Sequence, residues 1–449
     1  MKAIYLLLAS ILFSLLSIRK ARAQDGLSYD NSVLAEGPYD EYSSDIKSDS
    51  SFFSSFFVEP KRITLRHEVS YKFEDPSAIK NNRFSLLLEY SKYLLDNFYI
   101  KLDSKLNAFW IKDHRAEADN EKIAFQNNFI EGFLQFSIKQ TSIKAGVQKM
   151  IWGESEAGAI TDVISPRDYS ELFFISLEES RRGQPMISVD QFTKIGDWTV
   201  FFVPFPAFNR YPLKGTAYYF DPFNGNARYR DEKTDKGNFE YGLKWKKTFG
   251  SSDISLMSAS LIDNDYAFRA DGYSADGLIL VTRMKQRFNI AGMTLNYTFG
   301  DFILKGEAAV KLKKSYNSVS YQIVKRNAID AALVLDYTPK GGSLALSLEA
   351  VNSHTCGWND EIQIVPRNIY SLVFTWNKTF FNQNLSIFGM TIYTSPYTSF
   401  LHKLMLSYKL SDHITLFLDG FYPDVRDERN TNWRYSDQKQ VDFKIQYQF

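Results

Sequence analysis

The chain has 449 residues and a formal net charge of +1 at pH 7, which argues against nucleic acid as a partner. Its single cysteine, Cys356, rules out an intramolecular disulfide and a CxxC metal or redox site. Aromatic residues make up 16% of a chain whose average hydropathy is mildly polar. A transmembrane β-barrel accommodates such a composition, because its rings face lipid and form girdles at both interfaces.

The first 23 residues are predicted to be a signal peptide. A basic start, Met1-Lys2, precedes the apolar stretch Ala3–Ile18, and Ala21-Arg22-Ala23 has the small-x-small pattern that signal peptidase cuts. The alternative is an uncleaved anchor, although the apolar stretch is short for a membrane span. No cysteine lies at the cut, so the chain is not expected to be a lipoprotein.

Residues 24–61 do not alternate and are rich in Ser, Asp, Glu and Tyr, with "SSFFSSFF" at Ser50–Phe57. We predict a periplasmic lead-in there, followed by an outer-membrane barrel over 62–449. No later run reaches the apolar length that a membrane helix needs, so the barrel must cross with strands.

Strict alternation of apolar and polar residues begins at Arg62 and recurs along the chain in segments of about ten residues, the length that a tilted strand needs to cross the hydrocarbon. Period two places apolar groups on one face and polar groups on the other. The alternation predicts these charged residues on the luminal face: Arg62, Arg66, Glu68, Lys72, Glu240, Lys244, Lys246, Lys305, Glu307, Lys311 and Asp419.

Two interpretations of these luminal charges are possible. One is a solvated wall whose charges compensate each other, which we prefer. The other is a modest cationic bias that would favour anions.

The connections between the segments come in two sizes, as an up-and-down barrel with short turns and long outer loops requires. Short ones, such as Phe299-Gly300-Asp301, carry the residues of tight hairpins. Counting segments predicts an all-β, antiparallel transmembrane barrel of about 16–18 strands, 18 being preferred. Gly277–Lys285 is either a strand or part of a folded outer loop. The long connections are expected near 111–124, 151–185, 206–236, 263–286, 353–366 and 422–438.

The connection at 151–185 stands out because it is long and has a defined sequence, "IWGESEAGAITDVISPRDYSELFF" at Ile151–Phe174. A loop of this length is either functional or folded inward, and we predict an inward fold that narrows the lumen. Arg167 is expected to form a buried ion pair with Asp162, Asp168 or Glu154 that fixes the loop to the wall. Direct substrate contact by Arg167, Glu154, Arg181 or Arg182 is the alternative. The predicted constriction residues are Trp152, Gly153, Glu154, Asp162, Pro166, Arg167 and Asp168.

The last segment, Val441–Phe449, alternates without interruption and ends on phenylalanine. This ending resembles the C-terminal signature by which the barrel assembly machinery recognises Gram-negative outer-membrane barrels. Phe449 is therefore the candidate assembly signal. An amphipathic terminal strand alone would also suit a soluble sandwich.

Two stretches carry a resemblance to a known family. "AGVQKMIWGESEAGAITDVISPRDYSELF" (Ala145–Phe173) and "TFGDFILKGEAAVK" (Thr298–Lys311) resemble a family of proteobacterial outer-membrane barrels catalogued as a domain of unknown function. More distantly, the chain resembles alginate exporters and phosphate-selective porins. The family resemblance implies an RND-type inner-membrane exporter and a LolB-like periplasmic lipoprotein as partners, and a hydrophobic or lipid-like substrate.

The sequence therefore predicts an integral outer-membrane channel or transport component that passes a solute or lipid-like substrate. The alternative is a non-conducting surface barrel that binds a ligand or host surface through its outer loops. We expect no catalysis, cofactor or metal, because no G-x-S-x-G or H-x-x-x-H pattern is present. The partners besides those of the family are outer-membrane lipid and the assembly machinery.

Overall fold

The computed structural model describes residues 62–449 except 76, 111–124, 156–159, 172–176, 214–217, 233–237 and 363–364. The predicted signal peptide (1–23) and lead-in (24–61) lie outside the described residues, as does the predicted long connection at 111–124. Among the described residues, no helix has the length and apolar character needed to cross a membrane.

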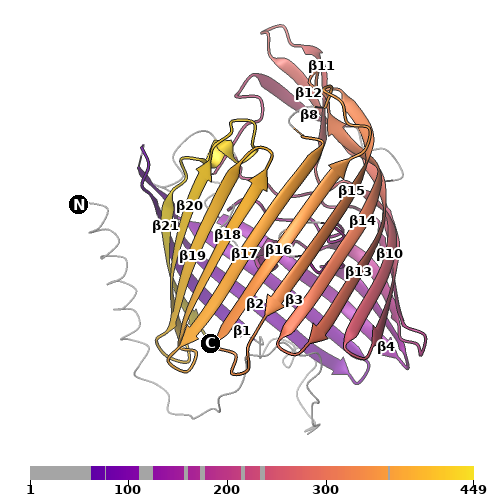
Figure 1. The fold of residues 1–449 in the computed structure, drawn as a ribbon, viewed down its shortest axis with the longest axis vertical. Helices are drawn as coiled ribbons and strands as arrows, with labels where there is room; N and C mark the ends of the chain where they lie inside the picture. Colours follow the sequence, from indigo (N-terminus) through magenta and orange to yellow (C-terminus); the bar gives the residue numbers. More distant parts are fainter. Residues whose placement is uncertain are drawn as a thin grey trace. The chain divides into compact units, whose positions relative to one another are not determined.

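Eighteen antiparallel strands form one closed barrel (Figure 1). It closes because β1 (Arg62–Lys72) pairs with both β2 (Ala78–Leu95) and β21 (Gln440–Gln448). The predicted barrel of about 18 strands is thereby confirmed. The other strands are β3 (Phe98–Phe109), β4 (Phe125–Ile138), β5 (Thr141–Gln148), β6 (Gln184–Gln191), β7 (Asp197–Val203), β9 (Glu240–Phe249), β10 (Ser252–Ile262), β13 (Arg287–Phe299), β14 (Phe302–Asn317), β15 (Ile323–Tyr337), β16 (Leu344–Thr355), β17 (Asn368–Phe380), β18 (Leu385–Ser395), β19 (Ser399–Lys409) and β20 (Ile414–Val425).

One end of the barrel carries short turns and the other carries the long connections, and we call them the turn end and the loop end. At the turn end, Gly250 and Gly300 have a φ of 59°, a conformation that glycine adopts without strain. At the loop end, some strands extend beyond the predicted boundaries. β20 continues to Val425, so residues 422–425 belong to a strand and not to a loop, because Val425 still pairs with Ser399 of β19.

A second sheet of three strands stands at the loop end (Figure 1). It contains β8 (Ala227–Asp231), β11 (Ala267–Tyr273) and β12 (Ile279–Met284), with β8 parallel to β12. Gly277–Lys285 therefore contributes a strand to a folded outer loop and not to the barrel. The two helices of the described chain are short: α4 (Leu177–Ser180) and the 3-10 helix η3 (Trp433–Tyr435).

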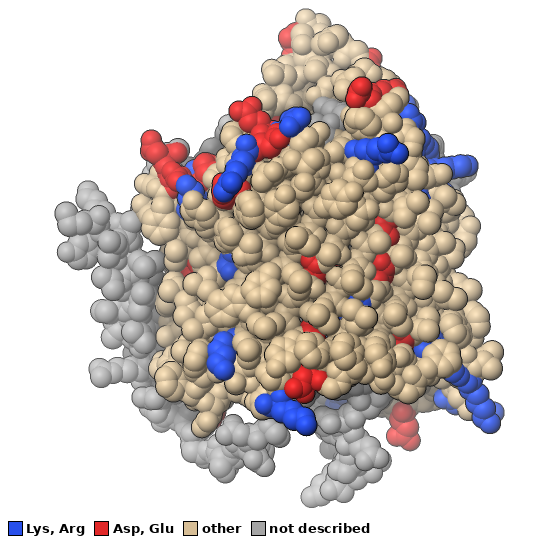
Figure 2. Space-filling view, in the orientation of Figure 1, with Lys and Arg blue, Asp and Glu red and all other residues tan. Residues whose placement is uncertain are grey.

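The strands alternate as period two requires. On β15, Ile329, Leu333 and Leu335 are exposed on the outward face, while Asp330 and Ala332 are buried on the luminal face. Figure 2 shows the result: the outward surface is mostly uncharged over the strands, and Lys, Arg, Asp and Glu gather toward the two ends. This is the surface that a hydrocarbon environment stabilises.

Candidate functional site

The described residues of the long connection between β5 and β6 (149–155, 160–171 and 177–183) lie inside the barrel. Near its start, Trp152 is 3% exposed and packs edge-on against Phe201 on the luminal face of β7, with ring centroids 5.2 Å apart. Ile160 and Ile164 are also buried there. Loop and wall share one apolar cluster: Trp152, Ile160, Ile164, Met186, Phe201, Val203, Met257, Ala259, Leu261, Phe288, Ile290, Ala309 and Ala332.

This cluster changes the expected picture of the lumen. The alternation was expected to line the interior with solvated charge, yet the luminal face from β6 to β15 carries a large apolar area. The sequence pattern misses it because a wall covered by the chain's own loop no longer faces water. Burial of such side chains stabilises the attachment by roughly 1.5–3 kcal/mol each.

Glu307, on β14, fixes the first part of the loop to the wall. Its carboxylate accepts hydrogen bonds from the backbone N–H groups of Glu154 (2.8 Å), Ser155 (2.9 Å) and Thr161 (2.6 Å), and from the Thr161 hydroxyl (2.6 Å). The Ser155 hydroxyl also donates to Glu349 on β16. The predicted luminal residue Glu307 is thus bound to the loop, and Glu349 is a contact that sequence reasoning missed.

Gly153 is needed at this attachment. A Cβ atom there would lie 3.0 Å from the Asp162 Cβ and 3.0 Å from a carboxylate oxygen of Glu307. Any side chain would therefore push the loop away from its acceptor.

Asp162 ties two parts of the loop together. It is 3% exposed and accepts hydrogen bonds from Arg167 (2.9 Å) and Arg181 (3.0 Å). Arg167 thus forms an ion pair with Asp162, one of its three expected partners, and both residues belong to the loop. Both guanidinium groups donate hydrogen bonds within the loop, so fewer of their N–H groups remain for direct contact with a solute. Pro166 lies at the same turn, where its carbonyl accepts from the backbone N–H of Arg182 (2.8 Å).

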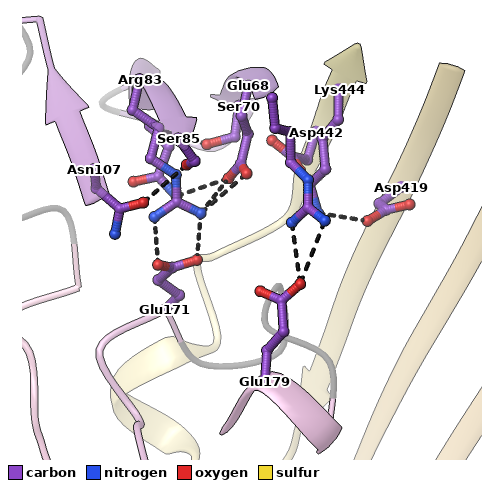
Figure 3. A network of polar contacts seen from close by, with 12 residues as sticks. Glu68, Ser70, Arg83, Ser85, Asn107, Glu171, Glu179, Asp419, Asp442 and Lys444 are labelled. Atoms are coloured by element: carbon purple, nitrogen blue, oxygen red, sulfur yellow. Dashed lines mark hydrogen bonds and ion pairs between the residues drawn. The ribbon is translucent and has the colours of Figure 1, made fainter. Parts of the chain in front are cut away.

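The later part of the loop reaches the opposite wall (Figure 3). Glu171 forms an ion pair with Arg83 of β2, which also binds Glu68 of β1 at 3.0 Å. Glu179 accepts from Lys105 of β3 at 2.8 Å and from Arg66 of β1 at 3.3 Å. Neither Glu171 nor Glu179 was among the predicted site residues.

The electrostatics of these two loop carboxylates favour the ionised form. Burial raises the pKa of Glu179, but Lys105 and Arg66 lower it by more, so it lies well below its ordinary value. Burial likewise raises the pKa of Glu171, and Arg83 reverses the effect. Both groups therefore stay charged at neutral pH.

These two attachments lie on opposite sides of the barrel. Arg83 is on β2 and Glu307 on β14, and the strand order separates β2 from β14 by nine steps around an 18-stranded barrel. The chain between them consequently crosses the whole lumen.

A second connection, between β7 and β9, lies against the first. Arg210 forms an ion pair with Asp168 (2.6 Å), and its backbone N–H donates to the Arg167 carbonyl (2.8 Å). Tyr211 stacks on Tyr169 with ring centroids 5.6 Å apart. Sequence reasoning missed Arg210. The signal available was the proline-rich segment "VPFPAFNRYPL" (Val203–Leu213), which stands apart from the alternating strands.

Most of the other predicted luminal cations pair with carboxylates. Lys244 instead donates to the Trp152 carbonyl at 3.3 Å. This arrangement supports compensating charge over a cationic bias. The pairs are Arg62–Glu89, Lys72–Asp437, Lys246–Asp253, Lys305–Asp336 and Lys311–Asp330, while Asp419 binds Lys444.

Phe449 lies apart from this loop. The Phe449 ring is 63% exposed, and its backbone N–H donates to the Ile63 carbonyl (3.0 Å) at the seam between β21 and β1. His114 lies outside the described residues. Throughout the described ranges, no group of three His, Cys, Asp or Glu side chains is arranged to hold a metal ion.

A polar cavity of about 460 Å³ lies between this loop and strands β1–β4. It is lined by eight basic and six acidic side chains. The basic ones are Arg62, Arg66, Lys101, Lys105, Lys149, Arg181, Arg182 and Arg210, and the acidic ones are Glu89, Asp103, Glu131, Asp168, Glu171 and Glu179.

Comparison with solved structures supports the fold. The chain is similar to Pseudomonas aeruginosa OccK8 (OprE), with a TM-score of 0.52, 8% identity, and coverage of 86% of this chain and 97% of that one. Acinetobacter baumannii OccAB3 has a TM-score of 0.51 and 11% identity, with 86% of this chain and 98% of that chain covered. The outer membrane protein opdK of P. aeruginosa has a TM-score of 0.50 and 9% identity, with the same coverage of 86% and 98%. At these identities the likeness concerns the fold alone.

Among curated proteins, none matches the chain. A family model described as "Protein of unknown function (DUF1302)" matches residues 66–362, which is more than half of the chain. The match covers both stretches that carried the resemblance in the sequence. The chain therefore belongs to the DUF1302 family of proteins of unknown function.

Proposed function

We propose that this protein is an integral outer-membrane channel or transport component whose passage is controlled by the loop at residues 149–183. The observation that carries this proposal is the attachment of one loop to opposite walls, at Glu307 of β14 and at Arg83 and Lys105 of β2 and β3. A lumen crossed in this way conducts only through the space that the loop leaves, or after the loop moves.

The two attachments differ in kind, which gives the loop one firm and one releasable end. The end at β14 combines backbone hydrogen bonds with an apolar cluster. The end at β1–β3 depends on the ion pairs of Glu171 and Glu179. We therefore expect the loop to swing from β14 when the ionic end is released.

The outward apolar surface and the fold shared with an outer membrane protein support placement in the outer membrane. A cleaved signal peptide at 1–23 and assembly through Phe449 complete this part of the proposal. The periplasmic lipoprotein and RND-type exporter remain proposed partners, supported by the family resemblance of the sequence.

A surface-binding barrel is the second candidate function. The observation that favours it is the folded sheet β8–β12–β11 at the loop end, which carries exposed Tyr273 (75%) and Tyr229. Such a protein would give no conductance under any condition, whereas a channel would.

Single-channel recording in a planar bilayer tests the proposal. We expect the Glu171→Gln/Glu179→Gln variant to show larger or more frequent discrete openings than the unchanged protein, because Arg83, Lys105 and Arg66 lose their loop partners. Glu74→Gln removes a rim pair with Lys439 and is the matched control, expected to behave like the unchanged protein. A correctly folded double variant that stays silent would contradict the channel function and favour surface binding.

A further inference from the structure

The barrel wall has a low section at three neighbouring strands. β5 and β6 have eight residues each and β7 has seven, whereas β14 has 16 and β15 has 15. A tilted strand needs about 9–11 residues to cross the hydrocarbon. At β5–β7 the strands themselves are therefore too short to wall the barrel off from lipid over its full height.

The outward apolar residues show the same deficit. On β7 they run from Trp198 to Phe202, four residue steps or about 13 Å along the strand at ~3.3 Å per step. On β14 they run from Phe302 to Leu312, ten residue steps or about 33 Å along the strand. The apolar band of such barrels is about 25 Å tall. The loop-end part of the band is thus missing at β7.

The neighbouring strand β4 has an open edge along this gap. β5 pairs with β4 only over Gly132–Ile138, so the loop-end half of β4 has no β5 residue beside it. In its place, the Ile130 carbonyl accepts from the Gly183 backbone N–H at 3.2 Å, and Glu131 accepts from the Lys149 backbone N–H at 2.9 Å.

Irregular chain fills the gap, mainly residues 204–213, which contact the lumen-crossing segment 160–171 through the ion pair between Arg210 and Asp168. On one side Arg210 donates to Asn128 of β4, and on the other the Asn209 backbone N–H donates to the Asn264 carbonyl, just beyond β10, at 3.0 Å. The segment 204–213 has three prolines, which have no N–H group to satisfy. Its side chains Phe205, Tyr211 and Leu213 are 75%, 53% and 50% exposed.

Irregular backbone at membrane depth is tolerated only where it is buried in protein or lines a water-filled cavity. Here it is held by side-chain contacts and a few backbone bonds instead of a strand ladder. It can therefore be displaced without breaking the pairing of the barrel strands.

The polar cavity borders this gap on the β4 side, since Asn127, Asn128, Phe129 and Ile130 of the open β4 edge are among its lining residues. Each of the six lining carboxylates already forms an ion pair. Glu89 pairs with Arg62, Asp103 and Glu131 pair with Lys101, Asp168 pairs with Arg210, Glu171 pairs with Arg83, and Glu179 pairs with Arg66 and Lys105.

Arg182 is the basic group left for a ligand. It donates to the Phe208 carbonyl at 2.7 Å, and no carboxylate of the described chain forms an ion pair with it. Its guanidinium therefore joins the filling segment 204–213 to a cavity with more basic than acidic groups.

We propose that the gap at β5–β7 is a lateral passage between lumen and membrane, and that the cavity binds the anionic head group of an amphiphile whose alkyl chain lies in the gap. This inference rests on the proposed function and names its substrate class. A carboxylate or a phosphate head group has the required charge, and Arg182 is the residue expected to bind it.

Photolabelling tests this assignment. The full-length protein in phosphatidylcholine vesicles is labelled with dodecanoate that carries a diazirine on its terminal carbon, and the adducts are mapped by mass spectrometry. Adducts should concentrate at 125–131 and 204–213. Excess dodecanoate should compete and acetate should not, and competition by dodecyl phosphate distinguishes a phosphate head group from a carboxylate.

Arg182→Gln should reduce labelling in the gap by about tenfold at limiting probe concentration. Arg228→Gln, which removes an exposed ion pair with Asp276 on the small sheet, is the matched control and should not change it. Labels spread evenly over the outward strands would overturn the assignment. Even labelling together with discrete conductance would overturn the lateral passage alone. Gap labelling in a silent protein would overturn the channel function alone.

Discussion

Glu307 illustrates how far a single residue can be predicted here. Alternation over Phe302–Leu312 places it in the lumen, because its neighbours of opposite parity are apolar. Its partners on the loop cannot be predicted, because they are backbone N–H groups of Glu154 and Thr161, and every residue type except proline has such a group. The same limitation applies to Glu171 and Arg83, whose pairing joins positions far apart in the sequence.

The Glu307→Ala variant should loosen the loop while the barrel stays intact. Three backbone N–H groups and the Thr161 hydroxyl would lose their acceptor, which we expect to cost about 2–3 kcal/mol locally, a rise of about 30- to 150-fold in amide exchange. Hydrogen exchange measured by mass spectrometry over residues 149–165 checks this.

Asp336→Ala is the control for that experiment, because it removes a wall pair with Lys305 and no loop contact. Unchanged protection of the loop in the Glu307 variant would show that the apolar cluster alone holds it.

At the scale of elements, period two predicts the strands well and their ends poorly. β20 extends past its predicted end because strands can continue above the membrane, where the apolar face is no longer required. The early ends of β5 and β7 agree with the long connections expected at 151–185 and 206–236, although the segment just beyond β7, Pro204–Leu213, is apolar without being a strand. The inward loop was expected from its length, whereas its second support, the β7–β9 connection, was not.

The ionic end of the loop should respond to acid and not to mild pH changes. The pKa values of Glu171 and Glu179 in the folded protein lie below their ordinary value of 4.5. Their stabilisation is therefore fully present above that value and is lost as the pH falls through the folded pKa. Conductance should stay constant from pH 8 to about pH 5 and rise only in stronger acid.

The Glu171→Gln/Glu179→Gln variant should lose that acid response, because it has no charge left to titrate at this end. A rise in conductance already between pH 7 and pH 6 would contradict this assignment.

For the whole molecule, the barrel was predictable because lipid outside and polar groups inside impose one pattern on every strand. The apolar part of the lumen was not, since it exists only where the loop covers it. The account that results is a barrel of 18 strands whose lumen is crossed by one loop attached at opposite walls, β14 and β1–β3. Closure of the lumen by the loop should then depend on both attachments together.

The measurement that tests this claim most directly is the single-channel conductance of four proteins: unchanged, Glu307→Ala, Glu171→Gln/Glu179→Gln, and the triple variant. If the loop is held at both ends, Glu307→Ala and Glu171→Gln/Glu179→Gln each leave one attachment in place. The increase in conductance over the unchanged protein should then be larger in the triple variant than the sum of the increases in these two variants. Equal conductance in all four folded proteins would mean that the loop does not control the passage, and the account of the site would be wrong.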